Sequence, residues 1–308
     1  MAYISAVIPV YKSKDCLIEL HTRLKRVLES IGDKYEIIFV EDCGNDGAWE
    51  VILQICQEDP HTRGIRLSRN FGQHNALLCG IREARYDITL TLDDDLQHPP
   101  EEIPKLVGKL EEGYDVVYGP PREEQHGLWR DTASLITKSA LRKILGAKIA
   151  KDVCAFRVFR TRLREAFSSF SGPFVSIDVL LSWGAGRFGA VPVPHEARTK
   201  GKSNYTLGKL ASHAFNMITG FSVWPLRVAS IVGFVFTLFG MAVLVYVLGR
   251  YWTEGGTVRG FPFLASIIAI FSGAQLFALG ILGEYLARMH FKILDKPSYL
   301  VSERMDHR

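Results

Sequence analysis

The chain has 308 residues, 47% of them hydrophobic, and a formal net charge of +4 at pH 7. This length allows one or two domains with a sizeable core. The mild net charge argues against a nucleic-acid binder, and five scattered cysteines without a C-x-x-C pair argue against a zinc site.

In the first half of the chain, apolar β-rich runs alternate with segments of helical periodicity. The runs are SAVIPV, YEIIFVED, RGIRLS, DITLTL and YDVVYG, at residues 5–10, 35–42, 63–68, 87–92 and 114–119. This alternation predicts βαβ units and a Rossmann-like, mostly parallel α/β sheet. No basic region precedes the first run, so we expect no signal peptide and a cytoplasmic start of the chain.

Four of these expected strands are followed directly by loops that carry polar groups. The loops are the Pro-Val-Tyr of residues 9–11, VEDCGNDG at 40–47, SRNFG at 68–72 and TLDDD at 91–95. Ligands of parallel sheets bind outside the carboxyl ends of the strands, where such loops meet. The sequence therefore predicts a functional site at this edge of the sheet.

The last of these loops carries three consecutive aspartates. Adjacent carboxylates repel one another, and a carboxylate beside a core is costly to desolvate, so the cluster predicts a positive partner. A D-x-D at a strand end presents Asp93 and Asp95 to one point and turns Asp94 away. Oxygen ligands of this kind suit Mg²⁺ or Mn²⁺ shared with a diphosphate. Exposed aspartate pairs in turns also occur without a metal.

Two uncharged apolar runs, 228–248 and 261–283, lie near the end of the chain. At 1.5 Å per residue the first reaches about 31 Å, enough to cross a bilayer core. We therefore predict two transmembrane helices rather than two buried helices of a soluble core. Basic residues flank the pair on both sides, which places both chain ends in the cytoplasm. These residues are Lys200, Lys202, Lys209, Arg227, Arg288, Lys292 and Lys296.

Two further stretches, 128–146 and 205–224, combine apolar and basic residues at helical spacing. Both fit helices that rest in the lipid headgroup layer, and both also fit ordinary amphipathic helices packed on the sheet. The sequence leaves these two readings open.

The stretch ARTKGKSNYTLGKL, residues 197–210, is basic and directly precedes the first apolar run. Each Lys or Arg near a membrane surface attracts anionic headgroups by about 1 kcal/mol. Such a cluster is either a positively charged membrane flank or a loop that grips a phosphate. The Gly201–Asn204 turn favours a phosphate-gripping loop.

Several of these motifs together resemble a family 2 glycosyltransferase. They are IPVYKSKD, FVEDCGNDG, LSRNFGQHNAL, LDDDLQHPPEEIP, GYDVVYG, the F-R of CAFRVFR, and KGKSNY. More narrowly, the chain resembles the polyprenyl-phosphate glycosyltransferases, the dolichol-phosphate-mannose-synthase-like group, from Ile8 to about Pro297. This resemblance implies a GT-A domain followed by interfacial helices and two membrane spans. It also implies a homo-oligomer in the cell (inner) membrane, with the catalytic domain and both termini cytoplasmic.

The resemblance further implies inverting transfer of a hexose from a UDP- or GDP-linked sugar to a polyprenyl phosphate, with Mg²⁺ or Mn²⁺ as cofactor. It assigns catalytic roles to Asp93, Asp95, Asp152 and Arg157, with the metal on Asp93 and Asp95. It assigns the nucleotide-sugar to Pro9, Val10, Tyr11, Glu41, Asp42, Arg69, Asn70, Asp94 and Gln97. It assigns the acceptor phosphate to Arg122, Arg157, Arg198, Lys200, Lys202, Ser203 and Tyr205.

The chain departs from the family pattern at two places. It has Val40-Glu41-Asp42-Cys43-Gly44 where V-D-D-G-S is usual, and Ala155 where many members carry an acid before the F-R pair. A phosphate acceptor needs no base, because it is mostly ionised at neutral pH. We therefore expect Asp152 to position groups rather than to act as an obligatory base.

These assignments divide the chain into four parts. Residues 1–204 form a GT-A domain with the acceptor loop, 205–226 a juxtamembrane amphipathic helix, 227–286 a two-helix transmembrane domain, and 287–308 a cytoplasmic tail. Two alternatives remain: a processive polysaccharide synthase, whose Q-x-x-R-W motif this chain lacks, and a non-catalytic membrane adaptor on the same fold.

Overall fold

The structure is a computed structural model that describes residues 3–32, 34–122, 152–172, 175–196, 224–254, 260–294 and 296–306. The chain divides into two compact units, one of Met1–Ala214 with Asp295–Arg308 and the other of Phe215–Leu294. The first expected interfacial stretch, residues 205–223 of the second and the whole basic segment lie outside the described residues.

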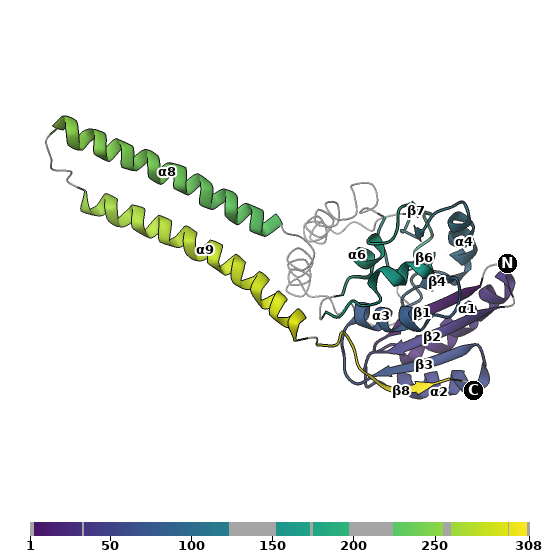
Figure 1. The fold of residues 1–308 in the computed structure, drawn as a ribbon. Helices are drawn as coiled ribbons and strands as arrows, with labels where there is room; N and C mark the ends of the chain where they lie inside the picture. Colours follow the sequence, from purple (N-terminus) through teal and green to yellow (C-terminus); the bar gives the residue numbers. More distant parts are fainter. Residues whose placement is uncertain are drawn as a thin grey trace. The chain divides into compact units, whose positions relative to one another are not determined.

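The first unit is built on one eight-stranded sheet with strand order β7-β5-β6-β4-β1-β2-β3-β8 (Figure 1). All five strands expected from the apolar runs are present, with these bounds: β1 Ile4–Val10, β2 Tyr35–Glu41, β3 Thr62–Leu67, β4 Ile88–Thr91 and β5 Val116–Tyr118. Three more strands were not expected: β6 Arg157–Arg160, β7 Phe188–Ala190 and β8 Val301–Met305.

The centre of the sheet is parallel, as the sequence predicts. Strand β1 pairs in parallel with both β2 and β4, and β2 pairs in parallel with β3. Strand β6 runs antiparallel between β4 and β5, and β8 runs antiparallel to β3 at the sheet edge. The carboxyl ends of β1, β2, β3 and β4 therefore share one edge.

Helices cover both faces of the sheet. Their bounds are α1 Leu17–Ile31, α2 Ala48–Glu58, α3 Gln73–Glu83, α4 Ile103–Glu111 and α6 Ile177–Ser182, with 3₁₀ turns η1 Lys14–Cys16, η2 Pro100–Glu102 and η3 Thr161–Phe167. Alternate residues of β1 pack against the helices on opposite faces of the sheet. On one face, Ala6 and Ile8 join the core formed with α1, α2 and α4. Val7 joins the core beneath α3 and α6. Both faces of β1 are therefore buried, which explains its continuous apolar run.

Strand β8 belongs to the first unit although it follows the last apolar helix in sequence. It closes the β3 edge of the sheet, where Trp49 donates through Nε1 to Glu303 Oε2 at 3.2 Å. Arg66 pairs with the same glutamate at 3.0 Å, and Arg63 is bonded to Asp306. Val301–Met305, within the expected C-terminal tail, is thus part of the sheet.

The second unit consists of two long helices, α8 Trp224–Glu254 and α9 Phe261–Ile293, which lie side by side (Figure 1). Within them, Pro225–Arg250 and Ile270–His290 are long and apolar enough to cross a membrane. The two helices pack closely at Gly240, where a Cβ atom would come within 2.8 Å of the Phe271 ring. The ring of Phe236 also meets Phe271 edge-on, with centroids 5.7 Å apart.

Candidate active site

The polar loops that follow the parallel strands meet at one edge of the sheet, as expected. The backbone N–H of Asp42, after β2, donates to the Val10 carbonyl at the end of β1, at 2.9 Å. The register of β1 with β4 places the start of the aspartate loop beside the end of β1. In β1 the side chains of Pro9 and Val10 are buried, whereas Tyr11 just beyond it is exposed.

The middle aspartate, Asp94, turns toward the end of β1. Its carboxylate accepts a hydrogen bond from the Tyr11 backbone N–H at 3.0 Å and another from the Ser13 hydroxyl. Burial raises the pKa of Asp94 to about 6, although these two donors act in the opposite direction. Asp94 thereby ties the β1 loop to the β4 loop, and its expected orientation away from Asp93 and Asp95 stays a prediction.

The carboxylates of Asp93 and Asp95 lie on the same loop and have different surroundings. Asp93 is partly buried and accepts a hydrogen bond from the Gln73 amide at the start of α3. Asp95 is buried, and its Oδ1 accepts from the Gln97 backbone N–H at 3.1 Å. Within the part of the chain that the structure describes, no group of three or more His, Cys, Asp or Glu gathers as a metal site.

Asp42 fastens the end of β2 to the loop that follows β3. It is 2% exposed, and its two carboxylate oxygens accept from the backbone N–H groups of Phe71 at 2.7 Å and Gly72 at 2.8 Å. Burial raises the pKa of Asp42 to about 6, against the effect of these two donors. The loop Ser68–Gly72, which we call the donor loop, is thereby fixed at its C-terminal end. The side chains of Arg69 and Asn70 within it are exposed.

Glu41, the other acid of this loop, is also engaged within the protein. Its Oε1 accepts from the Gly44 backbone N–H at 2.6 Å, and its Oε2 lies 3.3 Å from Arg66 Nε. Gly44 itself lies against the β1 loop, because an added Cβ would sit 2.8 Å from the Lys12 backbone nitrogen. The close approach explains a glycine at this position.

The loops at this edge hold unusual backbone conformations. In the described chain, the non-glycine residues with positive φ are Lys12, Cys43, Asn45 and Leu96, with φ between 53° and 61°. Each follows the end of β1, β2 or β4 within a few residues. Left-handed backbone is uncommon for such residues and clusters at functional sites. This clustering supports the edge as the active site.

Arg157 opens β6 beside the end of β4 and is fully buried. Its Nε donates to Thr91 Oγ1 at 3.0 Å, and its Nη1 is paired with Asp178 of α6. Asp178 also accepts from the Tyr118 hydroxyl at 3.0 Å. In this arrangement Arg157 stabilises the strand ends, and its expected phosphate contact stays a prediction. Asp152 is partly buried, five residues before it.

Glu196, the residue just before the basic segment, is bonded to the loop that follows β4. The backbone N–H of Glu196 donates to the Gln97 carbonyl at 2.9 Å, and Arg198 follows two residues later in the sequence. Arg122 lies beside Val193, three residues before Glu196, because its backbone N–H donates to the Val193 carbonyl at 2.9 Å. The other predicted phosphate ligands lie outside the described residues: Arg198, Lys200, Lys202, Ser203 and Tyr205.

His98 is a residue of this site that the sequence analysis did not single out. It is 9% exposed, and neither ring nitrogen has a hydrogen-bond partner among the described residues. The ring lies 5.4 Å from that of Phe156 and 5.0 Å from that of His195. Burial lowers the pKa of His98 to about 4, and His195 acts in the same direction. In the sequence, the one sign that His98 belongs to this site is its position three residues after Asp95.

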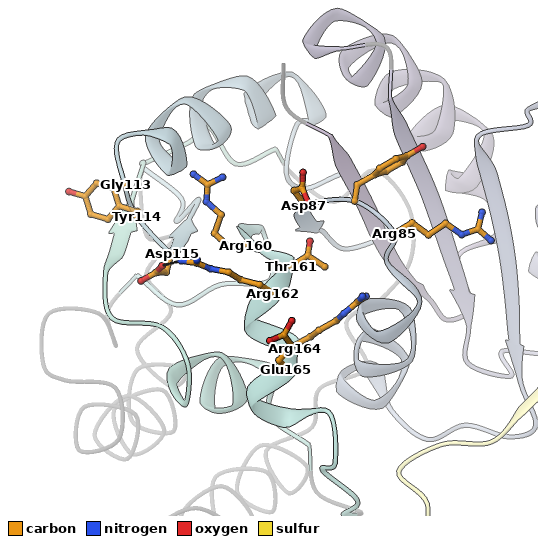
Figure 2. A pocket seen from close by; sticks show the side chains of 11 residues that line it. Arg85, Asp87, Gly113, Tyr114, Asp115, Arg160, Thr161, Arg162, Arg164 and Glu165 are labelled. Carbon is orange, nitrogen blue, oxygen red and sulfur yellow. Dashed lines mark ion pairs between the residues drawn. The ribbon is translucent and has the colours of Figure 1, made fainter.

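A pocket of about 550 Å³ lies at the opposite edge of the sheet (Figure 2). Four arginines and three acids are among its lining residues, and several of them are engaged locally. Arg162 pairs with Asp115 at 3.6 Å, and Asp115 accepts from the Gly186 and Arg187 N–H groups. Arg164 donates to the Ala84 carbonyl at the end of α3. These contacts are structural, and the pocket contains none of the predicted site residues.

The fold has solved relatives. A glucosyl-3-phosphoglycerate synthase from Mycobacterium tuberculosis, in complex with Mn²⁺, UDP-glucose and phosphoglyceric acid, is 19% identical and has a TM-score of 0.53; the match covers 71% of this chain and 78% of that one. A mannosyl-3-phosphoglycerate synthase from Rubrobacter xylanophilus is 16% identical with a TM-score of 0.51, over 84% of this chain and 78% of that one. At these identities the likeness shows a shared GT-A fold.

The sequence profile of glycosyl transferase family 2 matches residues 5–169. That range is more than half of the chain and contains the β1, β2, β3 and β4 loops and the strand that begins at Arg157. The family expected from the sequence motifs is confirmed. The protein therefore belongs to glycosyl transferase family 2.

Proposed function

We propose that this glycosyltransferase moves a hexose from a UDP- or GDP-linked sugar to polyprenyl phosphate at the cytoplasmic face of the cell membrane. The product is a polyprenyl-phosphate sugar for glycosylation of the cell envelope. One observation carries the acceptor assignment: the Gln97–Glu196 hydrogen bond fastens the aspartate loop to the chain that continues into the basic segment and then α8. This hydrogen bond supports an acceptor site close to the aspartate loop.

Asp93 and Asp95 are the residues that would hold Mg²⁺ or Mn²⁺. Carboxylate oxygens on a strand-end loop are suitable donors, and a site with few protein ligands suits a cation that also binds a diphosphate. The bound metal supplies charge stabilisation for the departing nucleoside diphosphate. The Mycobacterium tuberculosis synthase complex with Mn²⁺ and UDP-glucose supports this assignment by similarity.

The donor loop and the β1 loop provide the expected surroundings for the nucleotide. Tyr11, Arg69 and Asn70 expose their side chains at this edge. Asp42 and Glu41 are bound to backbone N–H groups and to Arg66, so we propose that they act mainly by holding these loops in shape.

The acceptor needs alignment more than deprotonation. A phosphate monoester has a second pKa near 6 and is mostly dianionic at neutral pH. An acceptor oxygen attacks the anomeric carbon, the bond from that carbon to the diphosphate breaks, and the nucleoside diphosphate leaves with the electron pair. In-line attack inverts the anomeric centre. No carboxylate base is required, which is consistent with Ala155 in place of the usual acid.

The basic segment would collect the lipid phosphate. Replacing Lys200 and Lys202 with alanine together should raise the KM for polyprenyl phosphate at least tenfold more than the KM for the nucleotide-sugar. Equal changes in both KM values would contradict a phosphate-gripping loop. Lys105→Ala, which neutralises an exposed lysine on α4, is the control.

Strand β8 bears on the membrane topology. We propose that the chain on either side of the apolar pair lies in one compartment, and the pairing of Val301–Met305 with β3 supports this. The helices α8 and α9 then cross the membrane an even number of times or not at all. Two crossings with cytoplasmic ends fit the basic flanks.

A donor panel tests the proposal. Full-length protein in detergent is mixed with UDP- or GDP-linked glucose, GlcNAc, galactose and mannose, polyprenyl phosphate, and Mg²⁺ or Mn²⁺. We expect release of nucleoside diphosphate that depends on lipid phosphate and formation of a single-sugar lipid. Release with 3-phosphoglycerate instead would favour a soluble phosphorylated acceptor, and a growing polymer would favour a processive synthase. Nucleotide binding without any transfer would favour a non-catalytic adaptor.

A further inference from the structure

Residues 296–300, between α9 and β8, contact the first unit through Ser298, Tyr299 and Leu300; we call them the post-helix segment. Ser298 is 5% exposed. Its hydroxyl donates to the Gly172 carbonyl at 2.8 Å and accepts from the Gly172 N–H at 3.2 Å. The Ser298 side chain therefore satisfies both backbone polar groups of the buried Gly172.

The same segment holds the donor loop at its first residue. The Leu300 carbonyl accepts from the Ser68 backbone N–H at 2.9 Å. The far end of the loop is held by Asp42, as described above. The next residue, Gln73, donates to Asp93. A continuous set of hydrogen bonds thus runs from the post-helix segment through the donor loop to the aspartates.

Tyr299 adds a contact with α3. Its ring lies 5.8 Å from the guanidinium of Arg82. Arg82 also donates to the carbonyls of Ser168 at 3.1 Å and Phe170 at 2.7 Å. The post-helix segment and Arg82 thereby hold residues 168–172 together.

We propose that the post-helix segment is a positioning element of the donor site, with Ser298 as its anchor, so that nucleotide-sugar affinity depends on it. The reason is pre-organisation: Arg69 and Asn70 project from a five-residue loop whose backbone is fixed at both ends before a ligand arrives. A loop held in its binding conformation loses less entropy when it binds. This inference rests on the proposed nucleotide-sugar donor.

The test compares Ser298→Ala with Ser302→Ala in the full-length protein. Ser302 is exposed on β8 and donates to the Arg66 carbonyl, outside the donor loop, so it is a matched control. The probes are UDP and GDP with Mn²⁺, measured by calorimetry, together with the separate KM values for donor and lipid phosphate. Ser298→Thr, which keeps the hydroxyl, is the rescue variant.

We expect Ser298→Ala to raise the nucleotide Kd and the donor KM about fivefold, the size of one net hydrogen bond. The KM for lipid phosphate should stay unchanged, Ser302→Ala should match the wild type, and Ser298→Thr should recover most of the loss. If Ser298→Ala fails to fold, Tyr299→Leu is used, which removes the ring beside Arg82, with an expected rise of about twofold in the same two quantities.

An unchanged nucleotide Kd, or equal rises in the KM for donor and for lipid phosphate, would overturn the inference and leave β8 only as cover for the sheet edge. Wild-type protein that binds neither nucleotide would overturn it too. Wild-type protein that binds a nucleotide but fails to transfer sugar to polyprenyl phosphate would refute the proposed function, while the Kd comparison would still decide the inference.

Discussion

The buried carboxylate of Asp42 predicts a measurable dependence of stability on pH. Burial raises the pKa of Asp42 from an ordinary value of 3.8 to about 6. A raised pKa means that the folded protein binds the proton more tightly than the unfolded chain does. Between these two pH values the folded state therefore loses stability as pH rises. The full penalty for an ionised Asp42 is about 3 kcal/mol, and about 2 kcal/mol of it develops between pH 4.5 and 7.5.

The Asp42→Asn variant removes this titration and keeps the shape of the side chain. Its amide oxygen still accepts one of the two backbone N–H groups, so the variant loses at most one good hydrogen bond. The cost is about 1.5–3 kcal/mol for a bond to a charged group. At neutral pH this loss and the removed penalty are similar, so we expect little net change in stability there.

The assay is thermal unfolding of full-length protein in detergent at pH 4.5, 6.0 and 7.5, read by intrinsic fluorescence. We expect the wild-type Tm to fall relative to that of the variant by about 4–8 °C across this range. Taking the difference between the two proteins cancels the other titrating groups. A Tm difference that stays constant from pH 4.5 to 7.5 would refute the assigned burial penalty.

Three further changes test packing and the metal site. Gly80→Ala places a methyl group 2.3 Å from a methyl carbon of Val7 in β1, so it should destabilise the first unit by about 1–3 kcal/mol. The control is Gly108→Ala on α4, whose added methyl group meets nothing within 4 Å and should leave stability unchanged or slightly raised. Thermal unfolding measures both variants. Gly240→Leu should separate α8 from α9 and Gly233→Leu should not, as measured by cysteine cross-linking between the helices; equal cross-linking in both would contradict the close contact. Asp95→Asn should lower kcat/KM at least a hundredfold and weaken Mn²⁺-dependent nucleotide binding, and retained Mn²⁺ dependence would argue against its metal role.

Two strands and one buried ion pair were not predicted, because they depend on contacts between residues far apart in the sequence. The strand RVFR was missed because four residues give too short an alternation to separate from loop, and its antiparallel place between β4 and β5 is a matter of long-range pairing. Val301–Met305 was missed because β8 is mostly exposed and polar, and its pairing partner lies more than 200 residues earlier. The buried pair of Arg157 and Asp178 was missed because the two residues lie on different elements.

At the site, the sequence located the loops but not the inner contacts of their side chains. The convergence of the β1, β2, β3 and β4 loops follows from parallel pairing, and parallel pairing follows from the alternation of strands and helices. The binding of Asp42 to Phe71 and Gly72 does not follow from any pattern, because it depends on how closely two loops approach. The lack of a hydrogen-bond partner for either ring nitrogen of His98 among the described residues likewise depends on what surrounds the ring.

The amino-acid sequence by itself determined the five parallel-sheet strands, their shared carboxyl edge and the two apolar helices, because these depend on periodicity, run length and charge, which are local properties. The tertiary structure alone decided which carboxylates are engaged within the protein. It also decided where β6 enters the sheet, and that the C-terminal residues close the sheet and hold the donor loop. These outcomes depend on hydrogen bonds and burial between residues far apart in the chain, and such contacts exist only once the chain has folded.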